Sequence, residues 1–240
     1  ITTDLQMMTY AIGPQTPEIH SLRVQHRADL VTLMVPNSGL NLMHGTSWLL
    51  TSFNPAPAFG FNVIEAPFVN TSVLAHEIGH NLGCNHATND IGAIFGGAFT
   101  NSFGYRFNTV SVNGITNQIR TLMAYGPGRR IGYFSNPGIN FWGVPTGDTN
   151  TANNAYTIER TAPMVGTYMS GGYGPPYYYT PSTGGGTQIT ATFLRSVATA
   201  RAFFGTSRSP RMIARSALPS ARALALAVAP SVRIGRSRTV

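Results

Sequence analysis

Residues 71–83 carry the clearest helical pattern in this 240-residue chain, and they constrain its fold more than any other segment. Apolar side chains recur along the segment every four residues, at Leu74, Ile78 and Leu82. The side chains of residues 70–72 can cap the start of a helix, and Gly83 suits the left-handed backbone that commonly ends one. The sequence therefore predicts one amphipathic helix here, with its apolar stripe against a core.

Two histidines of this helix, His76 and His80, lie four residues apart, so their side chains project from one face about one turn from each other. This spacing suits two nitrogen ligands of one metal ion. Glu77 can direct its carboxylate at a water molecule beside the metal, as a general base must. A catalytic zinc takes three protein ligands and one open position, and His86, just beyond the predicted helix end, is placed to be the third. A fourth side chain would close the site, so we interpret Cys84 as a small buried thiol.

The full pattern His-Glu-x-x-His-x-x-Gly-x-x-His resembles that of the metzincin clan of zinc endopeptidases, and it runs from His76 to His86. That clan also carries a methionine-containing turn beneath the metal, and the run Thr-Leu-Met-Ala-Tyr-Gly at residues 121–126 resembles this turn. Three further segments resemble the bacterial reprolysin-like (adamalysin-type) branch, at residues 133–137, 144–147 and 161–163. The likeness covers about residues 4–168.

The resemblance implies a role for each residue of the pattern. His76, His80 and His86 would hold one catalytic zinc ion, and Glu77 would take a proton from water and later pass it to the leaving amine. The methionine, Met123, would support the site from below.

Tyr125 matches a tyrosine that astacin-like and serralysin-like members use as an extra zinc ligand or oxyanion donor. Reprolysins do not depend on that tyrosine, so Tyr125 has a second interpretation as a wall residue. The residue after the third histidine is Ala87, where many reprolysin-like enzymes carry aspartate, so we expect altered support of the site. No sequence motif supports a calcium site, although calcium is compatible with the resemblance.

The expected fold is an α/β (α+β) metzincin-like zincin, with a twisted mixed sheet, the active-site helix and an irregular C-terminal subdomain. The sequence predicts a helix in residues 17–29 and strands at 30–35 and 60–65, the latter the edge strand by family likeness. Residues 96–147 are rich in Gly, Asn and Pro and indicate irregular connections.

A final helix is predicted at residues 151–168, where Pro163 is expected to interrupt or kink it. Metzincin domains carry a first strand and a long helix ahead of the region matched by residues 4–35. We therefore expect a catalytic domain at 1–170 that is N-terminally incomplete.

Charge divides the chain at about residue 170. The formal net charge is +8, yet residues 1–170 hold seven arginines and eight acids, whereas residues 171–240 hold nine arginines and no acid. The composition of 171–240 predicts a Gly/Pro/Tyr linker and a disordered Arg/Ala/Ser-rich tail of unknown partner. No apolar run approaches the roughly 20 residues of a spanning helix, so we expect no membrane span.

These observations favour a metalloendopeptidase that acts on protein or peptide substrates, and the resemblance implies secretion. Two alternatives remain open: a vestigial, non-catalytic zincin-fold binding module, and a thermolysin-type zincin with Glu159 as the third ligand. A nucleic-acid-binding protein would rest on the basic tail alone, and we expect no nucleic-acid partner.

Overall fold

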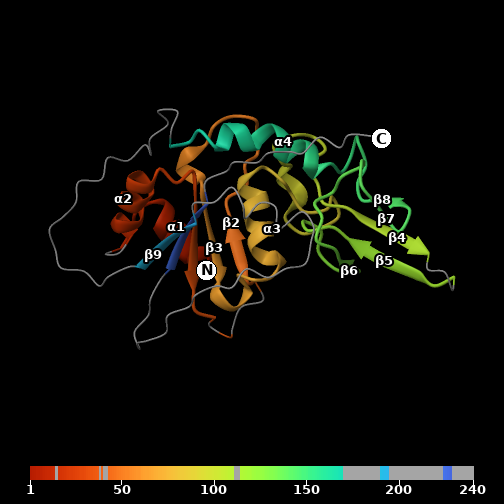
Figure 1. Cartoon of the computed structure of the whole chain (residues 1–240), viewed down its shortest axis with the longest axis horizontal. Helices are drawn as coiled ribbons and strands as arrows, with labels where there is room; N and C mark the ends of the chain where they lie inside the picture. The colour runs from red at the N-terminus through yellow and green to blue at the C-terminus, as the bar shows by residue number, and fades with distance from the viewer. Residues whose placement is uncertain are drawn as a thin grey trace.

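The apolar strand predicted at residues 30–35 is β1 (Leu30–Val35) of the computed structural model, and it lies in the middle of a five-stranded sheet. The structure describes residues 1–13, 16–37, 39, 43–110 and 114–169, together with the backbone of 190–194 and 224–228. Figure 1 shows this sheet and the two N-terminal helices at one end of the molecule and a group of short strands at the other, with a central helix between them.

The sheet is mixed. β3 (Phe61–Glu65) pairs in parallel with β1, with Val31 opposite Phe61, and β2 (Gly45–Ser47) pairs antiparallel with the other side of β3. β2 therefore occupies the edge, and the expectation that residues 60–65 form the edge strand is wrong. The reason is that all five residues of β3 are buried, as a strand with a neighbour on each side requires.

The other side of β1 pairs antiparallel with β10 (Leu224–Val228), and β9 (Thr190–Leu194) pairs in parallel with β10. Apart from these two backbone segments, the linker and tail predicted at residues 171–240 lie outside the described residues, so that domain division stays a prediction. Within the described part of the chain, no helix has the length and apolar character needed to cross a membrane.

Two helices precede β1. The helix predicted in residues 17–29 is α2 (Thr16–His26), whereas α1 (Thr2–Thr9) has no counterpart in the sequence prediction. α1 lacks a capping side chain at its start and packs through Leu5 and Met8 into a core with Ile19 and Phe61. Tertiary packing rather than local signals therefore holds α1.

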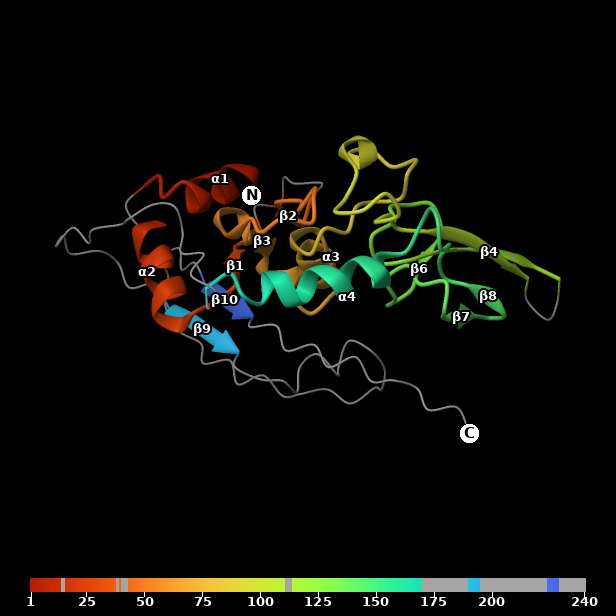
Figure 2. The ribbon, with the colours of Figure 1, turned by 90° about the horizontal axis from the view of Figure 1, so that it is seen from above.

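The predicted active helix is α3 (Ser72–Asn81), and Figure 2 shows it between the sheet and the short strands. The hydroxyl of Thr71 accepts a hydrogen bond from the Val73 N–H at 3.2 Å and caps the start. The predicted end is confirmed, since Gly83 has φ of +86°. A Cβ at this glycine would also lie 2.5 Å from the Cβ of Ala98, so the turn leaves no room for a side chain.

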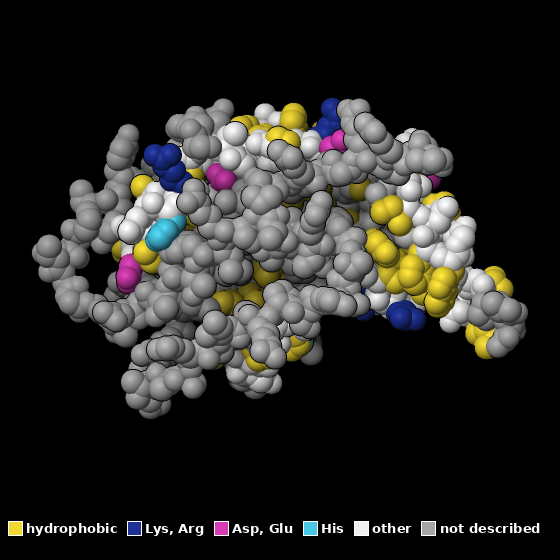
Figure 3. Space-filling model, in the orientation of Figure 1, with side chains coloured by type: hydrophobic (Ala, Val, Ile, Leu, Met, Phe, Trp, Pro, Cys, Tyr) yellow, Lys and Arg dark blue, Asp and Glu magenta, His cyan; other side chains and the backbone are white. Residues whose placement is uncertain are grey.

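Residues 96–147 are more regular than predicted. β4 (Arg106–Val110) and β5 (Thr116–Arg120) form an antiparallel pair, β6 (Arg129–Arg130) pairs in parallel with β5, and β7 (Asn140–Phe141) pairs with β8 (Val144–Pro145). The short 3-10 turns of the chain lie at Pro57–Phe59, Ala66–Phe68 and Ala93–Phe95. Hydrophobic side chains gather on the surface at the end that holds β4 to β8 (Figure 3).

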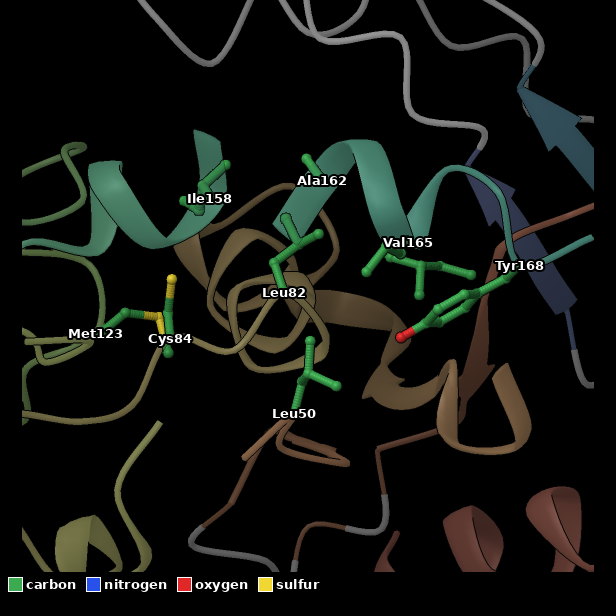
Figure 4. Packing of buried hydrophobic residues seen from close by; sticks show 9 residues of the cluster. Leu50, Leu82, Cys84, Met123, Ile158, Ala162, Val165 and Tyr168 are labelled. Atoms are coloured by element: carbon green, nitrogen blue, oxygen red, sulfur yellow. The ribbon is translucent and has the colours of Figure 1, made fainter. Parts of the chain in front are cut away.

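The predicted final helix is α4 (Asn154–Val165), which runs through Pro163, so the expected interruption is wrong, whereas a kink stays a prediction. Both Pro163 and Glu159, whose carbonyl the missing proline N–H would have bonded, are exposed, so water can take that place. α4 lies over the end of α3, and Figure 4 shows Leu82 pointing toward α4 beside Ile158 and Ala162. This packing fixes the platform from which the histidines project.

Candidate metal centre

The structure brings the imidazoles of His76, His80 and His86 together. Their Nε2 atoms are 3.1 Å apart between His76 and His86, 3.2 Å between His76 and His80, and 3.0 Å between His80 and His86. Two nitrogen ligands of a tetrahedral zinc, each at about 2.0–2.1 Å, lie about 3.3 Å from each other. The spacing of the three nitrogens therefore fits one zinc ion.

The second nitrogen of each ring is committed to a backbone carbonyl. His76 Nδ1 donates to Leu122 O at 3.0 Å, His80 Nδ1 to Cys84 O at 2.8 Å, and His86 Nδ1 to Ile91 O at 3.3 Å. A carbonyl can only accept, so each neutral ring carries its proton on Nδ1 and leaves a lone pair on Nε2. Three lone pairs that converge without a proton between them are a metal-binding donor set.

The electrostatics agree with neutral rings. Burial lowers the pKa of His76 to about 3 and that of His86 to about 4, and it lowers the pKa of His80 well below its usual value. All three rings therefore stay unprotonated at neutral pH, the form that ligates metals.

The turn that carries Met123 lies directly beneath α3. Met123 is fully buried, and a Cβ at Gly79 of α3 would lie 2.7 Å from its sulfur. On the other side, a Cβ at Gly104 would lie 2.8 Å from the backbone carbon of Met123. Two glycines thus let this turn approach α3 closely, which places the Leu122 carbonyl within reach of His76.

Asp90 ties this turn to the loop that carries His86, a link that the sequence prediction missed. Its Oδ2 accepts hydrogen bonds from the Ala87 N–H at 3.1 Å and the Tyr125 N–H at 2.8 Å, and its other oxygen pairs with Arg106. Arg106 Nε also donates to the Tyr125 carbonyl at 3.0 Å. We expected altered support of the site because Ala87 replaces an aspartate. In the structure the carboxylate of Asp90, three residues further on, bonds the Ala87 N–H.

Glu77 is buried between α3 and the edge strand β2. A Cβ at Gly45 of β2 would lie 2.5 Å from Oε1 and 2.7 Å from Cγ of Glu77, so glycine is the residue that leaves space for this side chain. Burial raises the pKa of Glu77 to about 8. A cation nearby favours the charged carboxylate and opposes this shift.

Tyr125 faces two of the histidines. Its ring centroid lies 4.1 Å from that of His86 and 5.9 Å from that of His76, and the tyrosine is 40% exposed. The ring therefore forms a wall of the centre that is open to solvent on its other side.

The other residues considered from sequence lie apart from the centre. Cys84 is a buried thiol, as expected, and it is the carbonyl of Cys84 that faces His80. Glu159 is exposed on α4, and among the described residues the candidate metal group comprises the three histidines alone, which disfavours the thermolysin-type alternative.

A comparison with models of protein families also points to a metallopeptidase. The Reprolysin_5 model of metallo-peptidase family M12 matches residues 1–135, more than half of the chain. The chain belongs to metallo-peptidase family M12. The three histidines and Met123 of this M12 chain lie within the matched stretch.

Two relatives of the M12 chain are each named peptidyl-Asp metalloendopeptidase. The protein of Xanthomonas campestris pv. campestris is 29% identical over 172 residues, which cover 70% of this chain and 37% of the relative. That of Stenotrophomonas maltophilia K279a is 26% identical over 179 residues, which cover 70% of this chain and 38% of the relative. The M12 chain thus spans less than two fifths of these relatives' length.

One solved structure, titled "Structure of a chaperone-substrate complex", aligns with 69% of the M12 chain and 24% of its own, at 17% identity and a TM-score of 0.48. A likeness of this degree carries no argument about function.

Proposed function

We propose that this M12 chain is a zinc-dependent endopeptidase that hydrolyses internal peptide bonds. The observation that carries the proposal is the convergence of three neutral Nε2 atoms at 3.0–3.2 Å, each ring held by a carbonyl at its Nδ1. Three histidines and an open side are the donor set of a catalytic zinc site. Secretion, which the family resemblance implies, stays a prediction.

Each residue of the centre has a role in this proposal. His76, His80 and His86 hold the zinc ion, which when bound polarises the scissile carbonyl and lowers the pKa of water toward neutrality. Glu77 accepts a proton from the attacking water and delivers it to the leaving amine. Tyr125 lines the open side, where its hydroxyl can hydrogen-bond the substrate carbonyl.

The names of the relatives suggest the class of substrate. Their name, peptidyl-Asp metalloendopeptidase, places aspartate at the bond they cleave. We extend this to the present chain as a preference for peptides with an aspartate beside the scissile bond.

The first experiment combines metal analysis with peptide hydrolysis. Elemental mass spectrometry should find about one zinc per chain in the wild type and in Glu77→Gln, and none in His86→Ala. His26→Ala, which changes an exposed histidine of α2, is the matched control and should keep its zinc. Cleavage of a mixed peptide library should stop on chelation and return with zinc.

Glu77→Gln decides between the peptidase and a vestigial binding module. As loss of a general base, the substitution should lower kcat by about 10²–10⁴-fold while zinc stays bound. A folded, zinc-loaded wild type that cleaves no peptide would refute the peptidase proposal and favour the binding module.

A further inference from the structure

The sheet formed by β4, β5 and β6 carries two arginines near the metal centre that have no part in the roles proposed above. Arg120 ends β5, and its guanidinium donates to the backbone carbonyls of Gly128 at 2.7 Å and Ala124 at 2.8 Å. Arg130 ends β6, and its Nη1 donates to Ser72 Oγ at 2.8 Å. Arg120 thus stabilises the turn after Met123, whereas Arg130 forms a hydrogen bond with α3.

The contact with Ser72 locates Arg130 relative to the zinc ligands. Ser72 is the first residue of α3, and His76 lies four residues later, one turn along the same face. The positive charges of Arg130 and Arg120 are felt at His76, where they add to burial and to His86 in lowering its pKa. Arg130 also interacts electrostatically with Tyr125. Its guanidinium therefore contacts α3 one helical turn before the first of the three histidines.

The hydrogen-bonding capacity of the Arg130 guanidinium is only partly used by the described residues. Its Nε is buried and, among the residues that the structure describes, has no hydrogen-bond partner. No ion pair with a carboxylate is formed by Arg130 or Arg120 within the same part of the chain, and the nearby Asp90 is paired with Arg106. A half-buried cation without a counter-ion favours the binding of an anion, because partial burial weakens the competition from water.

We propose that Arg130 binds the carboxylate of the substrate residue next to the scissile bond and so sets a preference for aspartate. This inference rests on the proposed peptidase function and assigns its specificity to one residue. The planar guanidinium suits a carboxylate, which can accept hydrogen bonds from Nη2 and from the second N–H of Nη1, while the buried Nε stays inside the protein. Arg120 acts indirectly, since its Nε and Nη1 are engaged by backbone carbonyls.

The test uses a pair of quenched fluorescent peptides that differ only in Asp or Asn beside the scissile bond. The zinc-loaded wild type should cleave the Asp peptide with kcat/KM about 100-fold higher than the Asn peptide. Arg130→Gln should lose this preference, so that the ratio of kcat/KM for the two peptides falls from about 100 to about one. Arg129→Gln, which changes the exposed neighbour on the same strand, is the matched control and should keep the preference.

Binding provides a readout that does not depend on turnover. In the Glu77→Gln background, the Asp peptide should bind about 100-fold more tightly than the Asn peptide, and adding Arg130→Gln should equalise the two dissociation constants. Arg130→Glu should invert the preference toward a peptide with Lys at that position, a result that a merely structural role would not produce. Arg130→Met, which keeps the apolar stem, replaces Arg130→Gln if circular dichroism shows that the glutamine variant is unfolded.

The outcomes separate the two proposals. A wild type that cleaves no peptide in a zinc-dependent manner overturns the peptidase function itself. A wild type that cleaves both peptides equally well, or an Arg130→Gln variant that keeps the preference for Asp, overturns the assignment of Arg130 and leaves the peptidase function standing.

Discussion

The carboxylate of Asp90 accepts a hydrogen bond from the backbone N–H of Tyr125 at 2.8 Å, across 35 residues of sequence. The same oxygen accepts from the Ala87 N–H, next to His86. A single side chain therefore fixes the distance between the loop of the third histidine and the turn beneath the metal.

Asp90→Asn should weaken zinc binding by about 10–100-fold, as changes in groups that orient metal ligands commonly do. The substitution removes the charge that pairs with Arg106 and turns an amide NH2, which can only donate, toward that guanidinium, while the remaining oxygen still accepts from both backbone N–H groups. Competition with a chromophoric chelator measures the affinity. The control is Asp148→Asn, because among the described residues the Asp148 carboxylate bonds its own turn at Asn150 and Thr151, and its zinc affinity should stay within threefold of the wild type. Equal affinities for the two variants would contradict this role of Asp90.

Gly45→Ala should separate metal binding from catalysis. The new Cβ would lie 2.5–2.8 Å from three atoms of Glu77, so the carboxylate must move, while the three Nε2 atoms keep their positions. We expect kcat to fall about 100-fold, as a misplacement of about 1 Å can cause, with zinc content unchanged. Gly132→Ala, where a Cβ meets nothing within 4 Å, is the control. Wild-type kcat in Gly45→Ala would show that the position of Glu77 is not critical.

Thr161→Val should lower the free energy of unfolding by about 1 kcal/mol, or about 2–4 °C in Tm. The Thr161 hydroxyl of α4 can donate to the Leu82 carbonyl at the end of α3, 2.7 Å away, and valine keeps the shape without the donor. Thermal unfolding followed by circular dichroism measures the change. Thr167→Val, which removes an exposed hydroxyl contact to Met164, should shift Tm by less than half as much. Equal Tm shifts in the two variants would show that the loss of a threonine hydroxyl in general, rather than of the contact with Leu82, lowers the stability.

Acid should destabilise the protein in part through His20. Burial lowers the pKa of His20, and the charge of Arg23 adds to the shift against the hydrogen bond to the Met8 carbonyl. Since the folded-state pKa lies below the unfolded value of about 6.5, this stability is complete above about pH 6.5. It is lost as the pH falls through the folded-state pKa. Protonation also puts a proton on Nδ1, which is buried and lacks a partner among the described residues.

The variant His20→Gln isolates this effect, because its amide can still donate to the Met8 carbonyl. Its Tm should fall less than that of the wild type between pH 7 and pH 5. Because both proteins carry His76, His80 and His86, the contribution of these histidines cancels when the two Tm changes are subtracted. His26→Gln should follow the wild type. Parallel curves for wild type and His20→Gln would exclude His20 as a source of acid sensitivity.

The helix and the triad could be predicted because their signals are local. His76, His80 and Gly83 lie within eight residues of sequence, and helix geometry alone fixes where such spacings point. His86 could be proposed as the third ligand because it lies a short distance beyond the turn. The same reasoning located β1 and β3, which are short, mostly apolar runs interrupted by a single polar residue each, Thr32 and Asn62.

The parts that escaped prediction depend on contacts distant in sequence. β4 and β5 alternate buried and exposed residues only in part, and their pairing of Phe107 with Ile119 decides the strand state. The edge strand β2 has the sequence Gly-Thr-Ser, without any apolar pattern. Asp90 could have been noticed as an acid near the third histidine, but its partners at residues 106 and 125 emerge only from the fold.

The hydrogen bond from His76 to the Leu122 carbonyl joins residues 46 positions apart, and this separation sets an order of events during synthesis. The ribosome completes all three histidines long before it adds Leu122. Until that carbonyl arrives, the hydrogen bond that fixes the proton of the folded His76 ring on Nδ1 cannot form. A chain that stops before the 121–125 turn therefore contains all three histidines yet lacks the acceptor that orients the first of them.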